Sequence, residues 1–223
     1  MNKSKMLRVV SNPIKQKLKA ILPQKLLISR LPEQASNCIL LTFDDGPHPE
    51  ITPKVLTLLE EYNVRAIFFV VGRCISKAPY LLKQIQEQGH VIGNHTYIHS
   101  NGRQPWFLPY LLDLLRCQAE IEKYTGNRPK LFRPAGGRIS PTSLLVPRIL
   151  GMRAVNWSLE TDDWSCRISH EAQEAAERLI RRLTYGDIVL LHDENPHVLE
   201  ILDILLPVMR SQEHDLFSGI DFL

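Results

Sequence analysis

Two adjacent carboxylates, Asp44 and Asp45, end an apolar run and are followed at once by Gly46 and Pro47. Consecutive side chains of a strand point to opposite sides, and Gly-Pro ends strand pairing, so the two acids can take different roles. One carboxylate can bind a cation, while the other stays free to accept a proton from whatever the cation holds. An ordinary turn with solvated acids is the alternative interpretation of these four residues.

His95 and His99 are separated by three residues. That spacing predicts that both imidazoles lie on one side of a helical turn, within reach of one metal ion. The zinc-protease motif of similar spacing has a glutamate directly after its first histidine; Thr96 stands there in this chain, so a base must come from elsewhere. With Asp45 the pair would form a two-histidine, one-carboxylate set that leaves positions open for water and substrate. A capping pair or a coincidence of spacing is the alternative.

Arg133 and His192 each follow directly on a strand-like run. A cation within about 4 to 6 Å of a carboxylate keeps that carboxylate ionised and oriented, which gives Arg133 a specific use beside a metal-flanking acid. An imidazole that titrates near neutral pH suits the protonation of a leaving amine, which gives His192 a use as an acid. A surface ion pair for Arg133 and a buried structural role for His192 are the alternatives.

Short apolar runs of strand length alternate with amphipathic stretches of helical length from Cys38 onward. We expect six strands, at 38–43, 66–71, 90–93, 130–132, 153–157 and 188–191. We expect helices at 52–62, 79–88, 108–124, 141–150, 170–183 and 198–209, with cap or turn residues marking several of their ends. This alternation predicts a parallel sheet with helical crossovers, either open and doubly wound or closed as a barrel.

Each main polar cluster follows directly on one of these strand-like runs or overlaps its end. The clusters are Thr42–Pro47, Asn94–His99, Arg133–Gly137, Glu160–Trp164 and His192–Asp193. In parallel α/β folds, ligands gather at the carboxyl ends of the strands because the connecting loops there converge on one rim. Five clusters at such positions predict one shared site.

Composition and charge exclude several classes of protein. The chain has 223 residues, 44% hydrophobic and 23% charged, which fits one larger globular domain or one domain with an arm and excludes a fibrous protein. Residues 1–30 carry eight basic side chains and no acid, which leaves a net charge of −5 for residues 31–223 and disfavours a nucleic-acid-binding body. No apolar run approaches the ~18 residues of a membrane span.

Residues 1–36 are predicted to form a basic amphipathic extension ahead of a catalytic domain at 37–223. A short helix could start at Ser11–Pro13, with its apolar side chains opposite a lysine face. Residues 13–28 could then contact an anionic membrane surface peripherally, or the helix could pack against the domain. Polar residues interrupt every candidate for a secretory signal, and the four cysteines form no Cys-x-x-Cys pair, so we expect a cytoplasmic protein with reduced thiols.

Together these residues resemble the NodB-homology polysaccharide deacetylases, which include chitin, chitooligosaccharide and peptidoglycan deacetylases. Five stretches are similar to the five motifs of that family and stand in the family's order: 42–47 (TFDDGP), 94–100 (NHTYIHS), 132–137 (FRPAGG), 160–164 (ETDDW) and 190–193 (LLHD). Any one stretch would be a weak signal, but five in order form a strong one. The resemblance implies a distorted, incomplete (β/α) barrel and hydrolysis of an N-acetyl group on a hexosamine.

The resemblance also implies how the metal and the base would be held. Asp45, His95 and His99 would hold one divalent ion, with zinc as the expected metal, and the ion would polarise a bound water molecule for attack on the acetamide carbonyl. Asp44 would be the general base. Arg133 would keep Asp44 charged.

The remaining roles implied by the resemblance concern the leaving group and the substrate pocket. His192 would protonate the departing amine, and Asp163 would orient or tune that histidine. The metal and a backbone N–H near Gly136 would stabilise the oxyanion. Trp164 and Leu190 would wall the acetyl pocket.

Two features depart from the family's pattern. Relatives commonly carry an aromatic residue where Gly136 stands, so we expect a more open sugar platform, or one supplied by Trp106 or Phe107. Many relatives act on extracellular glycans, whereas no export signal is predicted here. We therefore expect the substrate to be an N-acetylated sugar, an oligosaccharide, or a lipid- or nucleotide-linked glycan precursor.

Three other functions fit parts of the pattern. Members of the same superfamily can cleave cyclic or other amides with this metal arrangement. A non-haem iron oxygenase also uses two histidines and one carboxylate, but that class usually builds on a double-stranded β fold. A non-catalytic glycan- or membrane-binding protein on a retired scaffold is the third, and the presence of base, ligands, arginine and acid together disfavours it.

Overall fold

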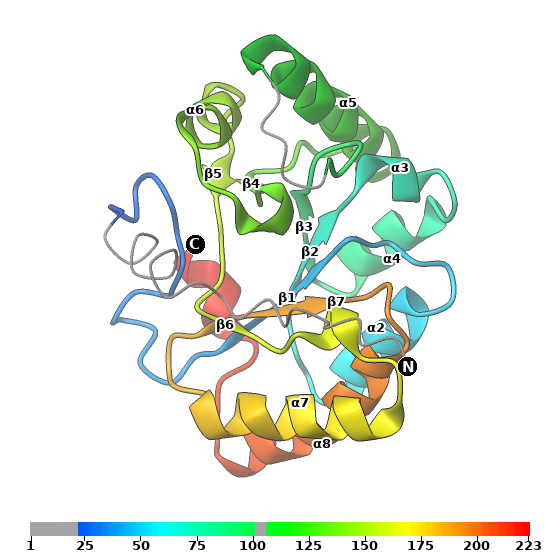
Figure 1. The fold of residues 1–223 in the computed structure, drawn as a ribbon, viewed down its shortest axis with the longest axis vertical. Coiled ribbons are helices and arrows are strands. Elements are labelled where there is room, and N and C mark those ends of the chain that lie inside the picture. Colours follow the sequence, from blue (N-terminus) through cyan, green and yellow to red (C-terminus); the bar gives the residue numbers. More distant parts are fainter. Residues whose placement is uncertain (1–21, 101–105) are drawn as a thin grey trace, which may run out of the picture.

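The computed structural model describes residues 22–100 and 106–223. Seven strands form one parallel sheet that curls into an open half-barrel (Figure 1). The strands are β1 (Leu40–Asp44), β2 (Ile67–Val70), β3 (Val91–Asn94), β4 (Leu131–Phe132), β5 (Arg153–Ala154), β6 (Leu159–Glu160) and β7 (Ile188–His192). Their order across the sheet is β5-β4-β3-β2-β1-β7-β6, which places β1 near the middle. The expected incomplete (β/α) barrel is confirmed.

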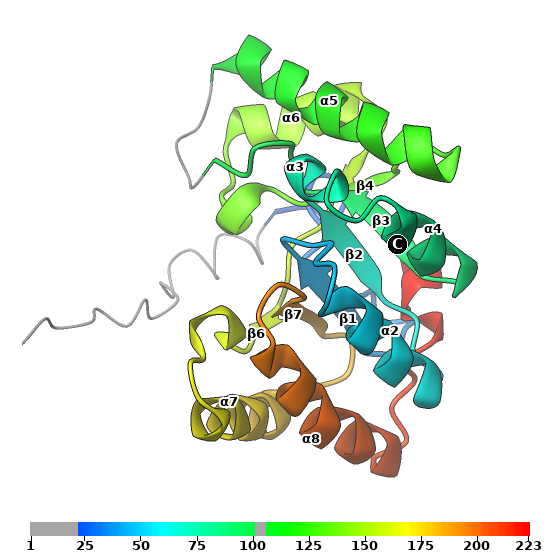
Figure 2. The same ribbon diagram turned by 90° about the vertical axis from the view of Figure 1, so that its right-hand side faces the viewer.

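Helices cover the outer face of the curled sheet (Figure 2). They are α2 (Thr52–Glu61), α3 (Gly72–Ile75), α4 (Tyr80–Glu87), α5 (Phe107–Thr125), α6 (Pro141–Ile149), α7 (Ser169–Arg182) and α8 (His197–Ser211), with short 3-10 turns η1 (Ala135–Gly137), η2 (Asp163–Ser165) and η3 (Ser218–Phe222). Both views place α5 and α6 at one end of the molecule and α7 and α8 at the opposite end.

Strand alternation divides the core into an inner and an outer layer. In β1, Leu41 and Phe43 pack with the helices in the larger hydrophobic cluster, whereas Leu40 packs inside the half-barrel with Ile67 and Ile188. Side chains two residues apart on a strand share a face, so the inner layer continues upward from these apolar residues to the polar ends of the strands. Apolar side chains thus fill the bottom of the half-barrel, and polar side chains lie at its rim, where the strands end.

All six expected strands and all six expected helices are present, with bounds shifted by a few residues. The structure adds β6, at Leu159–Glu160, and α3, at Gly72–Ile75. These elements have only two and four residues, which is too few for a periodic pattern of apolar residues to show in the sequence.

The N-terminal helix expected from Ser11 lies outside the described residues, apart from its last position. Residues 22–36 contain no helix, and Leu27, Ile28, Leu31 and Ala35 are buried against the domain. Ile28 also forms a parallel bridge with Val155, so this segment adds to the sheet's open edge beyond β5. Within the described ranges, no helix has the length and apolar character needed to cross a bilayer.

Candidate active site

The predicted polar clusters meet at the carboxyl ends of the strands. Asp44, the last residue of β1, pairs in register with His192, the last residue of β7. Asn94 ends β3 directly before His95, and Arg133 follows β4. The strands are parallel neighbours, so their ends bring side chains from distant parts of the sequence to one rim.

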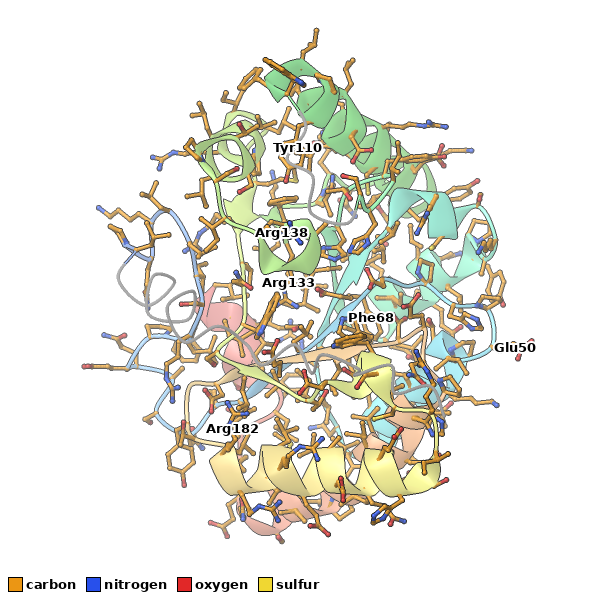
Figure 3. The ribbon with its side chains drawn as sticks, in the orientation of Figure 1. Glu50, Phe68, Tyr110, Arg133, Arg138 and Arg182 are labelled. Carbon is orange, nitrogen blue, oxygen red and sulfur yellow. The ribbon has the colours of Figure 1, made fainter. Side chains whose placement is uncertain are left out.

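Arg133 is fully buried and connects three parts of this rim (Figure 3). Its Nη1 donates to Asp44 Oδ1 at 2.7 Å and to Thr42 Oγ1 at 2.7 Å. Its Nε and Nη2 donate to the carbonyl oxygens of Val155 and Asn156, at 3.3 and 3.0 Å. The arginine therefore fixes one oxygen of Asp44, and the other, Oδ2, lies 3.5 Å from His95 Nε2 and faces the histidines.

Asp45, His95 and His99 form a cluster that could hold one metal ion. One ligand atom from each lies within 4.8 Å of the other two. Asp45 Oδ1 is 3.1 Å from His99 Nε2 and 3.5 Å from His95 Nε2. Among the described residues this buried oxygen has no hydrogen-bond partner, and such an orphaned acceptor is costly unless something else, such as a cation, satisfies it.

The protonation of the histidines suits the same use. His95 Nδ1 lies 2.8 Å from the carbonyl oxygen of Arg133, which can only accept, so Nδ1 carries the proton and Nε2 presents its lone pair to the cluster. Burial lowers the pKa of both His95 and His99, which keeps the rings neutral as metal ligation requires. Burial likewise raises the pKa of Asp45, and the neighbouring Asp44 carboxylate raises it further. These residues fit a divalent cation.

The expectation that His95 and His99 share a helical turn is wrong. Residues 95–100 form an irregular loop, in which Thr96 and His99 have positive φ angles of 69° and 52°. The loop turns because the backbone N–H groups of Tyr97 and Ile98 donate to the Asp113 carboxylate, at 2.9 and 3.1 Å. The convergence of the two imidazoles therefore depends on a side chain of α5.

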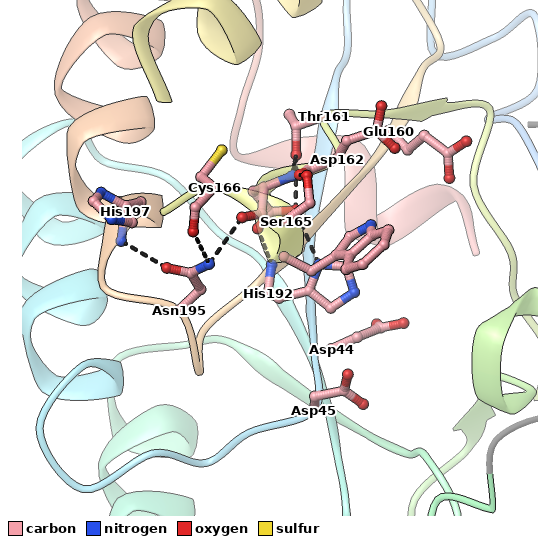
Figure 4. A network of polar contacts seen from close by, with 12 residues as sticks. Asp44, Asp45, Glu160, Thr161, Asp162, Ser165, Cys166, His192, Asn195 and His197 are labelled. Carbon is pink, nitrogen blue, oxygen red and sulfur yellow. Dashed lines mark hydrogen bonds and ion pairs between the residues drawn. The ribbon is translucent and has the colours of Figure 1, made fainter. Parts of the chain in front are cut away.

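His192, labelled in Figure 4, is held by the Asp163 carboxylate on two sides. The backbone N–H of His192 donates to Asp163 Oδ2 at 2.6 Å, and His192 Nδ1 lies 2.9 Å from Oδ1. Two neighbours fix Asp163 in turn. Thr161 Oγ1 donates to Asp163 Oδ1 at 2.8 Å, and Asn195 Nδ2 donates to the backbone carbonyl oxygen of Asp163 at 3.0 Å. Burial favours the neutral ring, but the Asp163 carboxylate outweighs burial and raises the pKa of His192 to about 9.

The three predicted pocket residues lie in different surroundings. Leu190 is 5% exposed and lies two residues before His192 on the inner face of β7. Trp164 is half exposed on η2 beside Asp163, and it lines a cleft of about 430 Å³ between η2 and the start of α8. Gly136 is exposed, with φ 59°, and its Cβ position faces open space. Neither Leu190 nor Gly136 lines that cleft.

Asp193 is a site residue that sequence reasoning did not single out. Its carboxylate is buried, accepts a hydrogen bond from Thr52 Oγ1, and has no partner for Oδ1 among the described residues. A Cβ atom at Gly46 would lie 2.2 Å from Asp193 Oδ1, so only glycine fits in the turn after Asp45. Burial raises the pKa of Asp193 to about 7. The position of Asp193 directly after His192 in the fifth motif was the available signal.

Comparison with known proteins gives matches over most of the chain. The family model described as polysaccharide deacetylase matches residues 32–155. A peptidoglycan-N-acetylglucosamine deacetylase of Bacillus cereus is 35% identical over 179 residues, which cover 78% of this chain and 82% of that protein. One of Listeria monocytogenes is 32% identical over 206 residues, which are 92% of this chain but 43% of that relative's length.

The fold matches solved structures as well. A crystal structure of a peptidoglycan N-acetylglucosamine deacetylase, in complex with 4-naphthalen-1-yl-N-oxidanyl-benzamide, superposes with a TM-score of 0.78 at 29% identity. The superposition covers 86% of this chain and 90% of the other. The family-model match over residues 32–155 includes β1, β3 and β4, whose ends carry part of the site.

Proposed function

Because the chain belongs to the polysaccharide deacetylase family, we propose that it removes an N-acetyl group from an N-acetylhexosamine of a glycan by metal-dependent hydrolysis. The observation that carries the proposal is the grouping at one rim of a possible metal site, a carboxylate fixed by a buried arginine, and a histidine whose pKa is raised to about 9. Hydrolysis of an unactivated amide needs all three functions, namely an electrophile, a base and an acid.

Asp45, His95 and His99 would hold the ion, and we propose zinc because two imidazoles and one carboxylate are a ligand set that catalytic zinc uses. When bound, such an ion polarises a water molecule and a carbonyl oxygen. His95 keeps Nε2 free for this purpose through the contact of its Nδ1 with the Arg133 carbonyl.

Asp44 is placed to act as the general base. Its Oδ1 is held by Arg133 at 2.7 Å, so the carboxylate cannot turn away, and Oδ2 faces the cluster of metal-ligating atoms. A water molecule between Asp44 Oδ2 and the acetamide carbonyl carbon would attack that carbon and give up its proton to Asp44 Oδ2. Thr42 Oγ1 accepts a second hydrogen bond from Arg133 Nη1 and so helps to fix the arginine.

His192 is placed to act as the general acid. With a pKa of about 9 the imidazole is protonated at neutral pH, and Nδ1 is bound to Asp163, so Nε2 is the nitrogen left to deliver a proton. The departing amine needs that proton when the C–N bond breaks, because an amide anion is a poor leaving group. Asp163 positions this ring and keeps it charged.

The proposed substrate class is the N-acetylglucosamine-containing glycan, on which the named relatives act. A lipid- or nucleotide-linked precursor, a cytoplasmic location, and membrane contact through residues 13–28 stay predictions from the sequence. Fractionation of cells that express the tagged full chain tests the location. Assays of acetate release from lipid-linked and nucleotide-linked precursors test the substrate.

Mass spectrometry of products tests the function. The full chain, loaded with zinc, is incubated with N-acetylated chitooligosaccharides, with peptidoglycan fragments, and with cyclic and linear amides that carry no sugar. We expect loss of acetyl groups from the glycans, release of acetate, and no such reaction with the Asp44→Asn variant. Turnover of the sugar-free amides alone would assign the chain to another amide hydrolysis, and binding of glycans without any turnover would make it a non-catalytic relative.

A further inference from the structure

We propose that the cleft between η2 and the start of α8 binds a second sugar residue of the glycan, next to the one that loses its acetyl group. The inference rests on the proposed function and deepens it, because it assigns a further binding site for the same substrate. The η2–α8 cleft has a volume of about 430 Å³, which lies within the range of roughly 300 to 1,000 Å³ typical of small-molecule sites. Its lining includes Trp164, Cys166, Arg167, Glu194, Asn195 and His197.

The η2–α8 cleft adjoins the proposed general acid. Trp164 directly follows Asp163, which binds the ring of His192. Glu194 is the second residue after His192 on the other wall. Among the described residues, none of the proposed metal ligands lines the cleft, and neither the base nor the acid does. The cleft is therefore a neighbour of the reacting centre and not a part of it.

The proposed mechanism determines on which side of the site the sugar ring lies. The acetyl carbonyl must face the cluster around Asp45, whereas the departing nitrogen must face His192 Nε2. The sugar ring is bonded to that nitrogen, so it lies on the His192 side of the acetyl group. Figure 4 shows Asn195 of the cleft and Asp45 on different sides of His192. A sugar linked to the reacting one can thus reach the cleft.

Two charged side chains of the cleft have no partner of opposite charge. Arg167 Nη1 donates to the backbone carbonyl oxygens of Trp164 and Cys166, at 3.4 and 3.3 Å, and the guanidinium forms no ion pair with any described residue. Glu194 is exposed, and within the described ranges its carboxylate forms neither a hydrogen bond nor an ion pair. The other N–H groups of Arg167 and both oxygens of Glu194 are therefore free to bind a ligand.

The two charges together favour a ligand with hydroxyl groups. A phosphate or carboxylate would pair with Arg167 but would be repelled by Glu194, and a cation would be attracted and repelled in the opposite way. A sugar hydroxyl can accept from the guanidinium and donate to the carboxylate. Trp164 is 47% exposed and offers an apolar ring on which the C–H face of a pyranose can pack. A neutral sugar residue uses all three side chains.

Hydrogen bonds hold the walls of the cleft in place. Asn195 Nδ2 donates to the backbone carbonyl oxygens of Asp163 and Cys166, at 3.0 and 3.2 Å, which joins η2 to the segment before α8. Asn195 Oδ1 accepts from the backbone N–H of His197 at 3.1 Å. A ligand that binds between fixed walls loses little free energy to ordering of the protein, so binding in the cleft can hold the glycan in place for the reaction.

Kinetics on substrates of increasing length test the proposal. Acetate release by the zinc-loaded full chain is measured on N-acetylglucosamine and on N-acetylated chitooligosaccharides, for wild type, Glu194→Ala and Arg167→Ala. In wild type kcat/KM should rise with length by about tenfold or more, and each variant should lose most of that rise. The control is Glu177→Ala/Arg181→Ala, an exposed pair on α7, which should keep the wild-type dependence on length.

Calorimetry separates failure of this proposal from failure of the proposed function. N-acetylated chitotetraose is titrated into Asp44→Asn and into Asp44→Asn/Glu194→Ala, and we expect about tenfold weaker binding in the second, because binding needs no turnover. Glu194 forms no hydrogen bond or ion pair within the described ranges, so its removal should leave the fold intact, which circular dichroism checks.

The outcomes are distinct. Acetate release whose dependence on length neither variant alters, with equal binding in the two titrations, would overturn the cleft as a sugar site and leave the proposed function standing. Weaker binding in the Glu194→Ala background, with no acetate released from any glycan by wild type, would support the cleft and refute the proposed function.

Discussion

Replacing Asp163 by Asn should move the alkaline limb of the pH–rate profile to a lower pH. Asp163 accepts from both the backbone N–H and Nδ1 of His192, and it raises the pKa of that ring from 6.5 to about 9 despite burial. The difference corresponds to roughly 3 kcal/mol in favour of the protonated ring. Asparagine removes the charge, and burial then favours the neutral form.

Two readouts follow from the sign of this shift. In wild type the rate should fall as the pH rises through about 9, and in Asp163→Asn it should fall near or below 6.5. Because the folded pKa is raised, its contribution to stability is complete below pH 6.5 and is lost as the pH rises through about 9. The variant's deficit in the free energy of unfolding should therefore be largest, at roughly 3 kcal/mol, below pH 6.5 and should shrink as the pH rises from 6.5 to about 9.

The matched control is Asp162→Asn, which changes the neighbouring, exposed carboxylate. Asp162 has φ 58°, a conformation that asparagine tolerates, so this variant should behave as wild type. Rates are followed by acetate release across the pH range, stability by denaturant titration, and the ring by NMR titration. Equal alkaline limbs in Asp163→Asn and wild type, or a wild-type His192 that titrates near 6.5, would refute the reasoning.

Three other substitutions test the remaining parts of the site. Asp44→Asn should abolish acetate release while mass spectrometry of the metal still finds about one ion per chain; loss of the ion would mean that the roles of Asp44 and Asp45 are exchanged. His99→Ala should strip the ion, whereas His170→Ala, an exposed histidine on α7, should keep it, and equal metal content in both would remove His99 from the ligand set. Arg133→Met breaks a fully buried ion pair and should cost about 3–5 kcal/mol in denaturant titration, against less than about 1 for the exposed Arg148→Met; equal costs would contradict the pairing with Asp44.

The strands and the rim were predictable because both leave strong local signals. Apolar runs such as Ile188–Leu191 end at polar residues, and in a parallel sheet those ends necessarily share one edge. That rule places Asp44 and His192 on one edge although 148 positions separate them, whereas only the structure shows that their strands are neighbours. The family resemblance then assigned the role of base to Asp44 and that of metal ligand to Asp45. The positions of the two residues alone did not distinguish these roles.

The parts that were missed depend on contacts between distant residues. The His95–His99 spacing suggested a helical turn, but Asp113, in the next helix, accepts the backbone N–H groups that bend the loop instead. No periodicity in the loop itself could reveal that partner. Asp193 was overlooked for a similar reason, since its burial against Gly46 is visible only in three dimensions.

Anomalous diffraction from crystals of the full chain grown with zinc tests the central claim most directly. Data collected on both sides of the zinc edge should give one strong peak in contact with Asp45 Oδ1, His95 Nε2 and His99 Nε2. Asp44 Oδ2, which lies 3.5 Å from His95 Nε2, should then lie beside that peak. A peak bound by other residues, or no peak between these three side chains in zinc-saturated crystals, would contradict the account.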